Sequence, residues 1–224
     1  MNYGSEISSS QRLSRRRVER GVRRRKRILA AAEQVFSARG FYEASITEIA
    51  LGADLAVGTI YLYFRDKADL YGSVIVEKMN EVVTRLEGAL NAEASAKACL
   101  RAAARALFAY HETNRQFFEL FLHQEQMARS PLNEAHWKQM EELKRRNLAS
   151  IEGCIVRGQQ NGDLKAGDPR LYAVAFLGIT LQIIRQWIRE RGNGQLSASA
   201  DFAADCFLNG AATPSILMKG NFGA

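Results

Sequence analysis

The sequence predicts an all-α protein, because it contains very few prolines and long stretches of residues that favour helix. The prolines are Pro131, Pro169 and Pro214, so residues 1–130 lack the residue that breaks helices most strongly. Alanine, leucine, glutamate, arginine and glutamine are abundant and lose little side-chain freedom in a helix. With 224 residues, 47% of them hydrophobic and 25% charged, the chain can form one large or two modest globular domains with a buried core.

The N-terminal segment is strongly basic. Residues 12–27 hold ten arginine or lysine side chains and one acid, Glu19, in a chain whose formal net charge is +7. Such a run repels itself, so it indicates an anionic partner, either nucleic acid or an anionic membrane surface. A disordered, solvated tail is the alternative for residues 1–17, and an arm that becomes ordered on DNA satisfies both interpretations. We therefore expect a basic, flexible arm over residues 1–20.

The first helix after the arm is indicated by apolar residues at three- and four-residue spacing, namely Ile28, Ala31, Ala32, Val35 and Phe36. Gly40 is placed to end it as a left-handed C-cap. Ser45 and Glu48 then make the S-x-x-E pattern of a capping box, which opens a second, short helix.

A tight turn around Asp54 and Leu55 leads to a third short helix near residues 57–64. Asp66 is placed to cap a fourth, longer helix from Lys67 to about Leu90. Further helices are expected at 95–114, 116–128, 131–160, 169–190 and 198–210. In Ser130-Pro131 and Asp168-Pro169 a capping side chain precedes a proline at the first helical position. A domain boundary is expected within the fourth helix, around residues 70–75.

Two short helices joined by a tight turn, behind a longer helix, are typical of a helix-turn-helix DNA reader. Residues 58–67 read G-T-I-Y-L-Y-F-R-D-K, in which Ile60 and Phe64 are four apart and face the core. Hydroxyls and a lysine that point elsewhere suit contacts with phosphate: Thr59, Tyr61, Tyr63 and Lys67. The alternative is that the two tyrosines only pack, with their hydroxyls in solvent.

The run from Ile49 to Leu70, I-A-x-x-A-x-x-x-x-G-T-I-Y-x-Y-F-x-x-K-x-x-L, closely resembles the DNA-binding domain of the tetracycline-repressor (TetR) family. The run R-x-x-I-L-x-A-A-x-x-x-F-x-x-x-G, from Arg25 to Gly40, resembles that family's first helix. The resemblance covers about residues 25–70. It implies an N-terminal three-helix helix-turn-helix DNA-binding domain and a C-terminal helical ligand-binding and dimerisation domain.

The resemblance also implies functional residues. Ser45 matches a residue that caps the second helix, and Thr47 lies where that helix approaches the DNA. Val57, Gly58 and Thr59 match the start of the recognition helix, while Tyr61, Tyr63 and Lys67 match phosphate-contacting positions. With Arg24 and Arg25 at the end of the basic run, these residues form the expected DNA-binding set.

The sequence departs from the family pattern at two positions. Asp54 stands where the turn usually has glycine, and aspartate tolerates left-handed backbone better than most residues. Ala56 stands where a serine or threonine usually caps the recognition helix, a loss of about 1 kcal/mol. Polar readout by this helix is therefore thin, and our hypothesis is that the arm at Arg15–Arg25 contributes more than usual, through the minor groove.

The second half of the chain carries many aromatic residues but no comparable motif. By the resemblance its helices enclose an effector pocket, for which we expect Phe108, Phe117, Phe121, Trp137 and Phe176. The last two helices are expected to pair across a two-fold axis through Tyr172, Phe176, Ile179, Ile183, Trp187, Phe202 and Cys206. The alternatives are that the aromatics fill the core and that the apolar stripes form a seam within one chain.

Several function classes are excluded or disfavoured. No G-x-S-x-G, P-loop or G-x-G-x-x-G after a strand is present, and no HExxH or Cys/His cluster predicts a metal. We therefore expect no enzyme activity, no metal and no cofactor. Cys99, Cys154 and Cys206 are distant in sequence and suit reduced thiols. The apolar run from Leu171 to Ile184 is shorter than a membrane span.

These observations predict a cytoplasmic, nucleoid-associated bacterial repressor that binds a pseudo-palindromic operator in double-stranded DNA as a homodimer and is released by a small-molecule effector. The expected domains are the arm at 1–20, the DNA-binding domain at 21–72, the effector and dimerisation domain at 73–212 and a tail at 213–224. A DNA-architectural protein of weak specificity, relying on the arginine arm, is the alternative.

Overall fold

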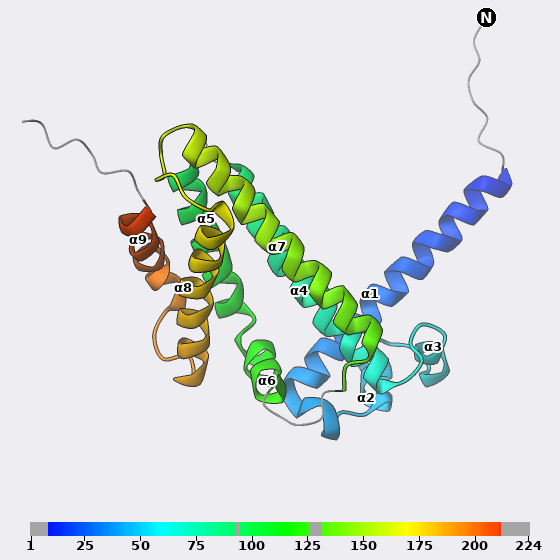
Figure 1. Cartoon of the computed structure of the whole chain (residues 1–224). Coiled ribbons are helices and arrows are strands. Elements are labelled where there is room, and N and C mark those ends of the chain that lie inside the picture. Colours follow the sequence, from blue (N-terminus) through cyan, green and yellow to red (C-terminus); the bar gives the residue numbers. More distant parts are fainter. Residues whose placement is uncertain (1–8, 93–94, 126–130, 212–224) are drawn as a thin grey trace, which may run out of the picture. The chain divides into compact units, whose positions relative to one another are not determined.

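The computed structural model describes residues 9–92, 95–125 and 131–211, and its regular structure there is entirely helical (Figure 1). The helices are α1 (Ser9–Glu43), α2 (Ile46–Gly52), α3 (Val57–Tyr61), α4 (Lys67–Ala92), α5 (Ala96–Thr113), α6 (Arg115–Glu125), α7 (Glu134–Gln160), α8 (Pro169–Arg189), the short 3-10 helix η1 (Leu196–Ser199) and α9 (Ala200–Ala211). The predicted all-α class is confirmed.

The described residues divide into two compact units, and the boundary lies inside α4, after Ile75. The N-terminal unit contains the described residues up to Ile75 together with residues 131–133, and the C-terminal unit contains the remainder. Helix α4 therefore belongs to both units.

The core of the N-terminal unit forms around the apolar face of α1. Ile28, Ala32 and Phe36 are fully buried there. The ring of Tyr71, from the first turns of α4, meets Phe36 edge-on with 5.0 Å between centroids. Phe41 packs against the same tyrosine at 5.1 Å. An aromatic cluster of this kind fixes the start of α4 against α1.

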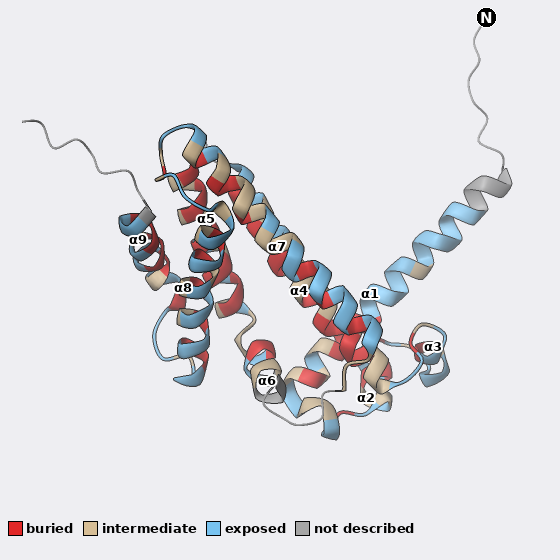
Figure 2. Ribbon diagram, viewed as in Figure 1, coloured by how far each residue is buried: buried red, intermediate tan, exposed pale blue. Residues whose placement is uncertain are grey.

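Helix α1 differs from the expectation at both ends. The arm that the sequence predicts as flexible is helical from Ser9, which agrees with the good helix propensity of arginine. Figure 2 colours the described side chains of this first part almost entirely as exposed. At the other end Gly40 adopts φ 76° and ψ 175°, so the regular helix is interrupted at the predicted glycine with a positive φ, and one further helical turn follows across the kink to Glu43.

In the C-terminal unit, α5, α7, α8 and α9 pack against one another, with α7 on α8 and α9 on both α5 and α8. The side chains of Leu100, Phe108, Ile151 and Phe176 are fully buried between them. Helices α5 and α7 approach closely at Gly158, where an added Cβ would lie 2.5 Å from the Cβ of Ala96. Only glycine permits this spacing.

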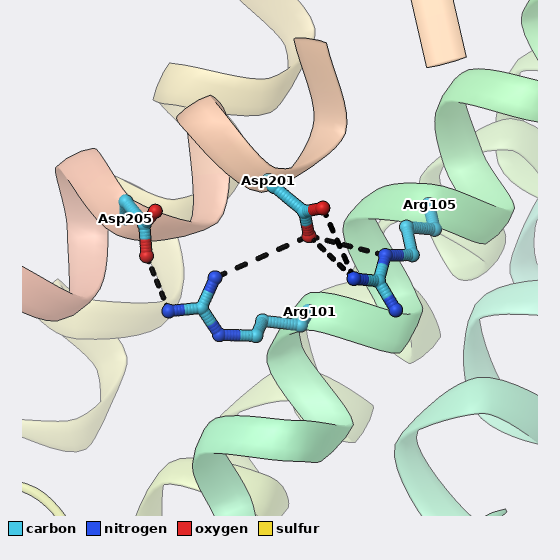
Figure 3. A network of polar contacts seen from close by, with 4 residues as sticks. All are labelled: Arg101, Arg105, Asp201 and Asp205. Atoms are coloured by element: carbon cyan, nitrogen blue, oxygen red, sulfur yellow. Dashed lines mark hydrogen bonds and ion pairs between the residues drawn. The ribbon is translucent and has the colours of Figure 1, made fainter. Parts of the chain in front are cut away.

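Ion pairs join helices that are distant in sequence. On α5, Arg105 binds Asp201 of α9 through Nε–Oδ1 at 3.1 Å and Nη2–Oδ2 at 3.0 Å, and Arg101 binds Asp205 one turn further along (Figure 3). On α7, Arg146 donates to Glu87 of α4, and this contact lowers the pKa of the Glu87 carboxyl. These ion pairs align α5 with α9 and α7 with α4 along their exposed faces.

The predicted helix bounds need two corrections. Helix α7 begins at Glu134, so Pro131 is not its first residue; Asn133, of a type favoured at N-caps, directly precedes the helix. The third helix ends at Tyr61, earlier than residue 64. In contrast, the start of α8 is as predicted, because Asp168 accepts a hydrogen bond from the Arg170 backbone N–H at 2.9 Å beside Pro169.

Candidate nucleic-acid interface and ligand cavity

The start of α2 has the predicted capping box. The Ser45 hydroxyl accepts from the Glu48 backbone N–H at 3.1 Å, and the Glu48 carboxylate accepts from the Ser45 backbone N–H at 3.3 Å. Arg39 also pairs with Glu48 at 2.9 Å. The Ser45 hydroxyl is thus used within the fold, whereas Thr47, two residues later, is exposed. Thr47 is therefore the polar side chain of this helix start that is available to DNA.

The turn between α2 and α3 is held by an arginine that the sequence analysis did not single out. Asp54 has a φ of 51°, the left-handed conformation expected of this position. Arg27 donates from Nη2 to the Ala53 carbonyl at 2.6 Å and lies 3.3 Å from the Asp54 carboxylate. Arg27 therefore braces the turn, and its position in a run of arginines gave no signal that separated it from its neighbours.

Helix α3 is short and presents its first turn outward. Ile60 is buried, as predicted, whereas Val57, Gly58 and Tyr61 are exposed and Thr59 is half-buried. Ala56 occupies the N-cap without a side-chain hydrogen bond, as its identity predicts. An added Cβ at Gly58 would meet nothing within 4 Å, so the backbone at this point is open to a groove of DNA.

The remaining predicted contact residues surround this helix. Tyr63 is half-buried, and its hydroxyl lies 4.0 Å from the Cβ position of Gly21 in α1. Lys67 donates from Nζ to the backbone carbonyls of Tyr42 at 3.1 Å and Ala44 at 3.0 Å. Two of its three ammonium protons are thus engaged, and Nζ also lies 4.7 Å from the centroid of the Phe41 ring.

The arginines of α1 add positive charge beside α3. Arg24 and Arg25 are both exposed, and the guanidinium of Arg25 lies over the ring of Phe64 at 5.2 Å. Preceding basic side chains on α1 whose exposure the structure describes, from Arg15 onward, are exposed as well. An exposed basic helix next to an open helix N-terminus is suited to binding the phosphate backbone of a nucleic acid.

The C-terminal unit encloses an apolar cavity of about 190 Å³. Its wall is formed by aliphatic, methionine and phenylalanine side chains from α4, α5, α6, α7 and α8. The apolar residues lining it are Met79, Val82, Val83, Leu107, Phe118, Phe121, Leu122, Met140, Leu143, Leu177, Leu181, Ile184 and Ile188. Two cations, Lys144 and Arg185, and two neutral polar residues, His111 and Asn147, complete the wall.

His111 and Asn147 are functional candidates that the sequence analysis missed. A histidine on an apolar helix face has no sequence pattern that predicts what it faces. In the structure His111 is buried and Nδ1 donates to the Leu107 carbonyl at 2.7 Å. Burial lowers the pKa of His111 to about 4, so the ring is neutral at physiological pH.

Only one of the aromatic residues predicted for the pocket lines this cavity. Phe121 does so, whereas Phe108, Phe117 and Phe176 are buried in the core around it. Trp137 is 41% exposed and lies in a different groove, on the outer side of α7. The core interpretation therefore holds for most of these residues, because aromatic spacing on a helix does not distinguish a core face from a cavity wall.

The residues predicted for dimerisation separate in a similar way. Phe202 of α9 is 66% exposed and Cys206 is exposed as well, while Tyr172, Ile179 and Ile183 are half-buried. Phe176 and Trp187 are buried within the chain, so they do not present a surface to a partner. The exposed apolar side chains of α8 are instead Leu171, Val174 and Leu181.

Two further features concern metal binding and membranes. In the part of the chain that the structure describes, no group of three or more His, Cys, Asp or Glu side chains could hold a metal ion. Helix α8 is long and apolar enough to cross a membrane by length and composition alone. Its buried face packs on α7 and α9, as in the core helix of a globular unit.

Comparisons with known proteins agree with both halves of this description. The model of bacterial regulatory proteins of the tetR family matches residues 28–74, and the model of the tetracyclin repressor-like C-terminal domain matches residues 93–211. The two matches cover the N-terminal core with the recognition helix, and the helices from α5 onward.

Individual relatives also align over most of the chain. The fatty acid metabolism regulator protein of Bacillus subtilis is 26% identical over 82% of this chain and 93% of its own length. The transcriptional activator FasR of Mycolicibacterium smegmatis is 26% identical over 74% of this chain and 72% of its own. The crystal structure of FadR from Bacillus subtilis in complex with stearoyl-CoA superimposes with a TM-score of 0.71, at 25% identity, over 83% of this chain and 98% of that one.

Proposed function

This chain belongs to the tetR family of bacterial regulatory proteins, and we propose that it is a repressor that an acyl-coenzyme A releases from its operator. Members of the family bind operator DNA as dimers and respond to small molecules, so the chain is a cytoplasmic, ligand-responsive transcription regulator. Its relatives are regulators and not enzymes, and we propose that it too lacks catalytic activity and works at the nucleoid.

The observation that carries the acyl-coenzyme A proposal is the apolar cavity with cations in its wall. An alkyl chain suits a wall of leucine, valine, methionine and phenylalanine, because burial in it removes apolar surface from water. Lys144 and Arg185 are both exposed, so they are placed to meet anionic groups that remain in solvent. A thioester of a fatty acid with coenzyme A combines these two chemistries in one molecule.

The volume of the cavity limits the length of acyl chain that it can hold without a change in the wall. About 190 Å³ is below the ~300–1,000 Å³ that ligand pockets usually enclose. A long acyl chain therefore requires the wall to open, and the half-buried Phe121 and Leu122 of α6 and the exposed Leu181 of α8 are lining side chains that are not fixed by complete burial. An effector that widens the cavity favours a second conformer, which is the requirement for control of DNA binding.

Helix α4 is the element through which such a change can reach DNA. Lys67 lies in its first turn, in the N-terminal unit, and Met79, Val82 and Val83 line the cavity further along the same helix. An effector that moves α4 therefore changes the position of the DNA-binding residues. The coupling equals the difference in the effector's affinity for the two conformers.

For the dimer we propose the exposed apolar residues of the last two helices as the interface. Leu171 and Val174 of α8 and Phe202 of α9 are all more than half exposed. Tyr172, Ile179, Ile183 and Cys206 contribute at the edges of this surface. Exposed apolar side chains that gather on neighbouring helices are typical of protein contacts.

The DNA contacts that we propose are those of the exposed first turn of α3 with Thr47, Tyr61 and Tyr63. The arginines of α1 and the positive charge of Lys67 supply phosphate contacts. Ser45 acts as a cap. DNA-architectural binding by the arm is the second candidate function, and the exposure of the α1 arginines is the observation in its favour.

The test is a fluorescence-anisotropy titration of the dimer on DNA from upstream of its own gene, with excess unrelated competitor DNA. We expect one fragment to remain bound in the competitor, and stearoyl-CoA to release it at concentrations at which coenzyme A alone does nothing. Loss of all fragments to the competitor would favour the architectural function. Survival of the complex at every acyl chain length would refute the acyl-coenzyme A effector.

A matched pair of variants on α4 sharpens this test. Val83→Phe fills the cavity from its wall, and we expect it to bind the operator but to lose the response to stearoyl-CoA. Thr84→Phe places the same side chain at the next position, which is exposed, and should keep the response. An equal response in both variants would mean that the effector binds elsewhere.

A further inference from the structure

Two neutral polar side chains interrupt the apolar wall of the cavity. His111 lies on α5 and Asn147 on α7, and neither is required to bury an alkyl chain. Burying a polar group is unfavourable unless a hydrogen bond compensates for it. Their presence in this wall therefore calls for a partner that an unsubstituted hydrocarbon does not supply.

The hydrogen bond of His111 to its own helix fixes which ring nitrogen can act on a ligand. The Leu107 carbonyl can only accept, so Nδ1 carries the proton at the 2.7 Å contact. In the neutral ring Nε2 is then an acceptor, and it has no hydrogen-bond partner among the described residues. The ring of Phe118 packs at 4.2 Å between centroids and holds the imidazole in this orientation.

Asn147 presents a second unused acceptor. Its Oδ1 atom is buried and makes no hydrogen bond in the described part of the chain. An unsatisfied buried carbonyl oxygen is rare and costly in a folded protein. Nε2 of His111 and Oδ1 of Asn147 are thus both acceptors without a partner among the described residues, and a single hydroxyl hydrogen can satisfy only one of them.

We propose that the effector is a hydroxylated acyl chain, whose hydroxyl donates its one hydrogen to Nε2 of His111, while the carboxamide of Asn147 turns to donate an N–H to the hydroxyl oxygen. A hydroxyl is the donor that suits an alkyl chain in this cavity, because it is neutral and adds little volume. This inference rests on the proposed acyl-coenzyme A effector and specifies which acyl groups are selected. His111 and Asn147 are then the residues that determine specificity.

A site built around a ligand hydroxyl discriminates against the analogue that lacks it, because the polar groups of the site are then left without partners. The discrimination is lost when those groups are replaced by apolar ones. The expected signature is therefore a difference between two ligands that disappears in a variant. A purely structural role of His111 would change the affinity for both ligands together.

The experiment compares stearoyl-CoA with a positional series of monohydroxylated stearoyl-CoAs, by operator release and by calorimetric titration of the DNA-free dimer. For the natural sequence we expect at least one positional isomer to bind about tenfold or more tightly than stearoyl-CoA. His111→Phe and Asn147→Leu should each reduce this ratio to within about twofold. Met140→Leu, which changes the cavity wall without changing its polarity, should retain the preference.

Two results would overturn the inference. One is equal binding of stearoyl-CoA and every hydroxylated isomer, which leaves the acyl-coenzyme A proposal intact. The other is a preference that persists in both apolar variants. If stearoyl-CoA and all the isomers fail to bind, the proposed function fails together with this inference. Operator binding and circular dichroism report whether each variant folds. If one variant does not fold, the ligand preference of the other variant tests the inference.

Discussion

Two regions of this protein, the helix starts of the N-terminal unit and the cavity wall of the C-terminal unit, use polar side chains in opposite ways. In the N-terminal unit polar groups are paired by the fold itself: Ser45 caps α2, Arg27 holds the turn at Asp54 and Lys67 binds two backbone carbonyls. In the C-terminal unit His111 and Asn147 line an apolar cavity with lone pairs that no described residue uses. Polar groups that are satisfied internally build a rigid DNA-binding surface, whereas unsatisfied ones in a cavity wall indicate a ligand.

The largest effect is expected for the arginine arm. Residues 12–17 contain four arginines, Arg12, Arg15, Arg16 and Arg17. If each neutralises one phosphate, their replacement by glutamine lowers the salt dependence of operator binding by a slope of about 3–4. The affinity at about 0.1 M salt then falls on the order of a thousandfold. Anisotropy titrations at several salt concentrations measure both quantities.

Replacing the same four arginines with lysine is the control. The charge is retained, so the salt slope should stay near that of the natural sequence, and any remaining loss reports contacts that need the guanidinium group. An unchanged salt slope in the glutamine variant would mean that the arm does not touch DNA.

The second effect concerns His111. Its pKa is about 4 in the folded protein and near 6.5 in the unfolded chain, so between these pH values only the unfolded state binds the proton. Stability is therefore complete above about pH 6.5 and is lost as the pH falls toward 4, by about 3 kcal/mol. Urea unfolding should show this loss in the natural sequence and in Asn147→Leu, but not in His111→Phe. Parallel pH profiles in all three proteins would contradict the burial of a neutral imidazole.

A smaller pair of effects distinguishes the two helix starts of the DNA-binding unit. Ser45→Ala removes a formed cap and should lower the free energy of unfolding by about 1 kcal/mol. Ala56→Ser supplies a cap that α3 lacks and should raise it by up to about 1 kcal/mol. Urea midpoints measure both. Ala56→Val, which has no hydroxyl, should give no gain, and a gain of equal size there would exclude capping as the cause.

The smallest effect is expected at the ion pairs between α5 and α9. Asp201→Asn removes the charge that Arg105 binds. The pKa of Arg105, which the Asp201 carboxylate raises, then returns toward its ordinary value. Exposed pairs contribute little to stability, so we expect a small decrease in Tm that vanishes in high salt. A large decrease that persists in salt would assign these pairs a role in holding α9 beyond surface electrostatics.

Features that depend on residues close together in the chain can be predicted from the amino-acid sequence. The capping box at Ser45 and the proline-started helix at Pro169 were predicted from local spacing. The left-handed residue at Asp54 and the missing cap at Ala56 were predicted by comparison with the TetR family pattern. Each follows from hydrogen bonds or dihedral preferences that span only a few residues. The resemblance to the TetR family rested on the same local pattern.

Which residues of the C-terminal unit face a cavity, the core or solvent depends on how its helices pack. Phe108 and Phe176 were expected at the pocket and are core, while His111 and Asn147 are in its wall and were not expected. An apolar helix face looks the same in sequence whether it meets another side chain or empty space. That difference arises from how α4, α5, α6, α7 and α8 pack together, over separations that no local pattern records.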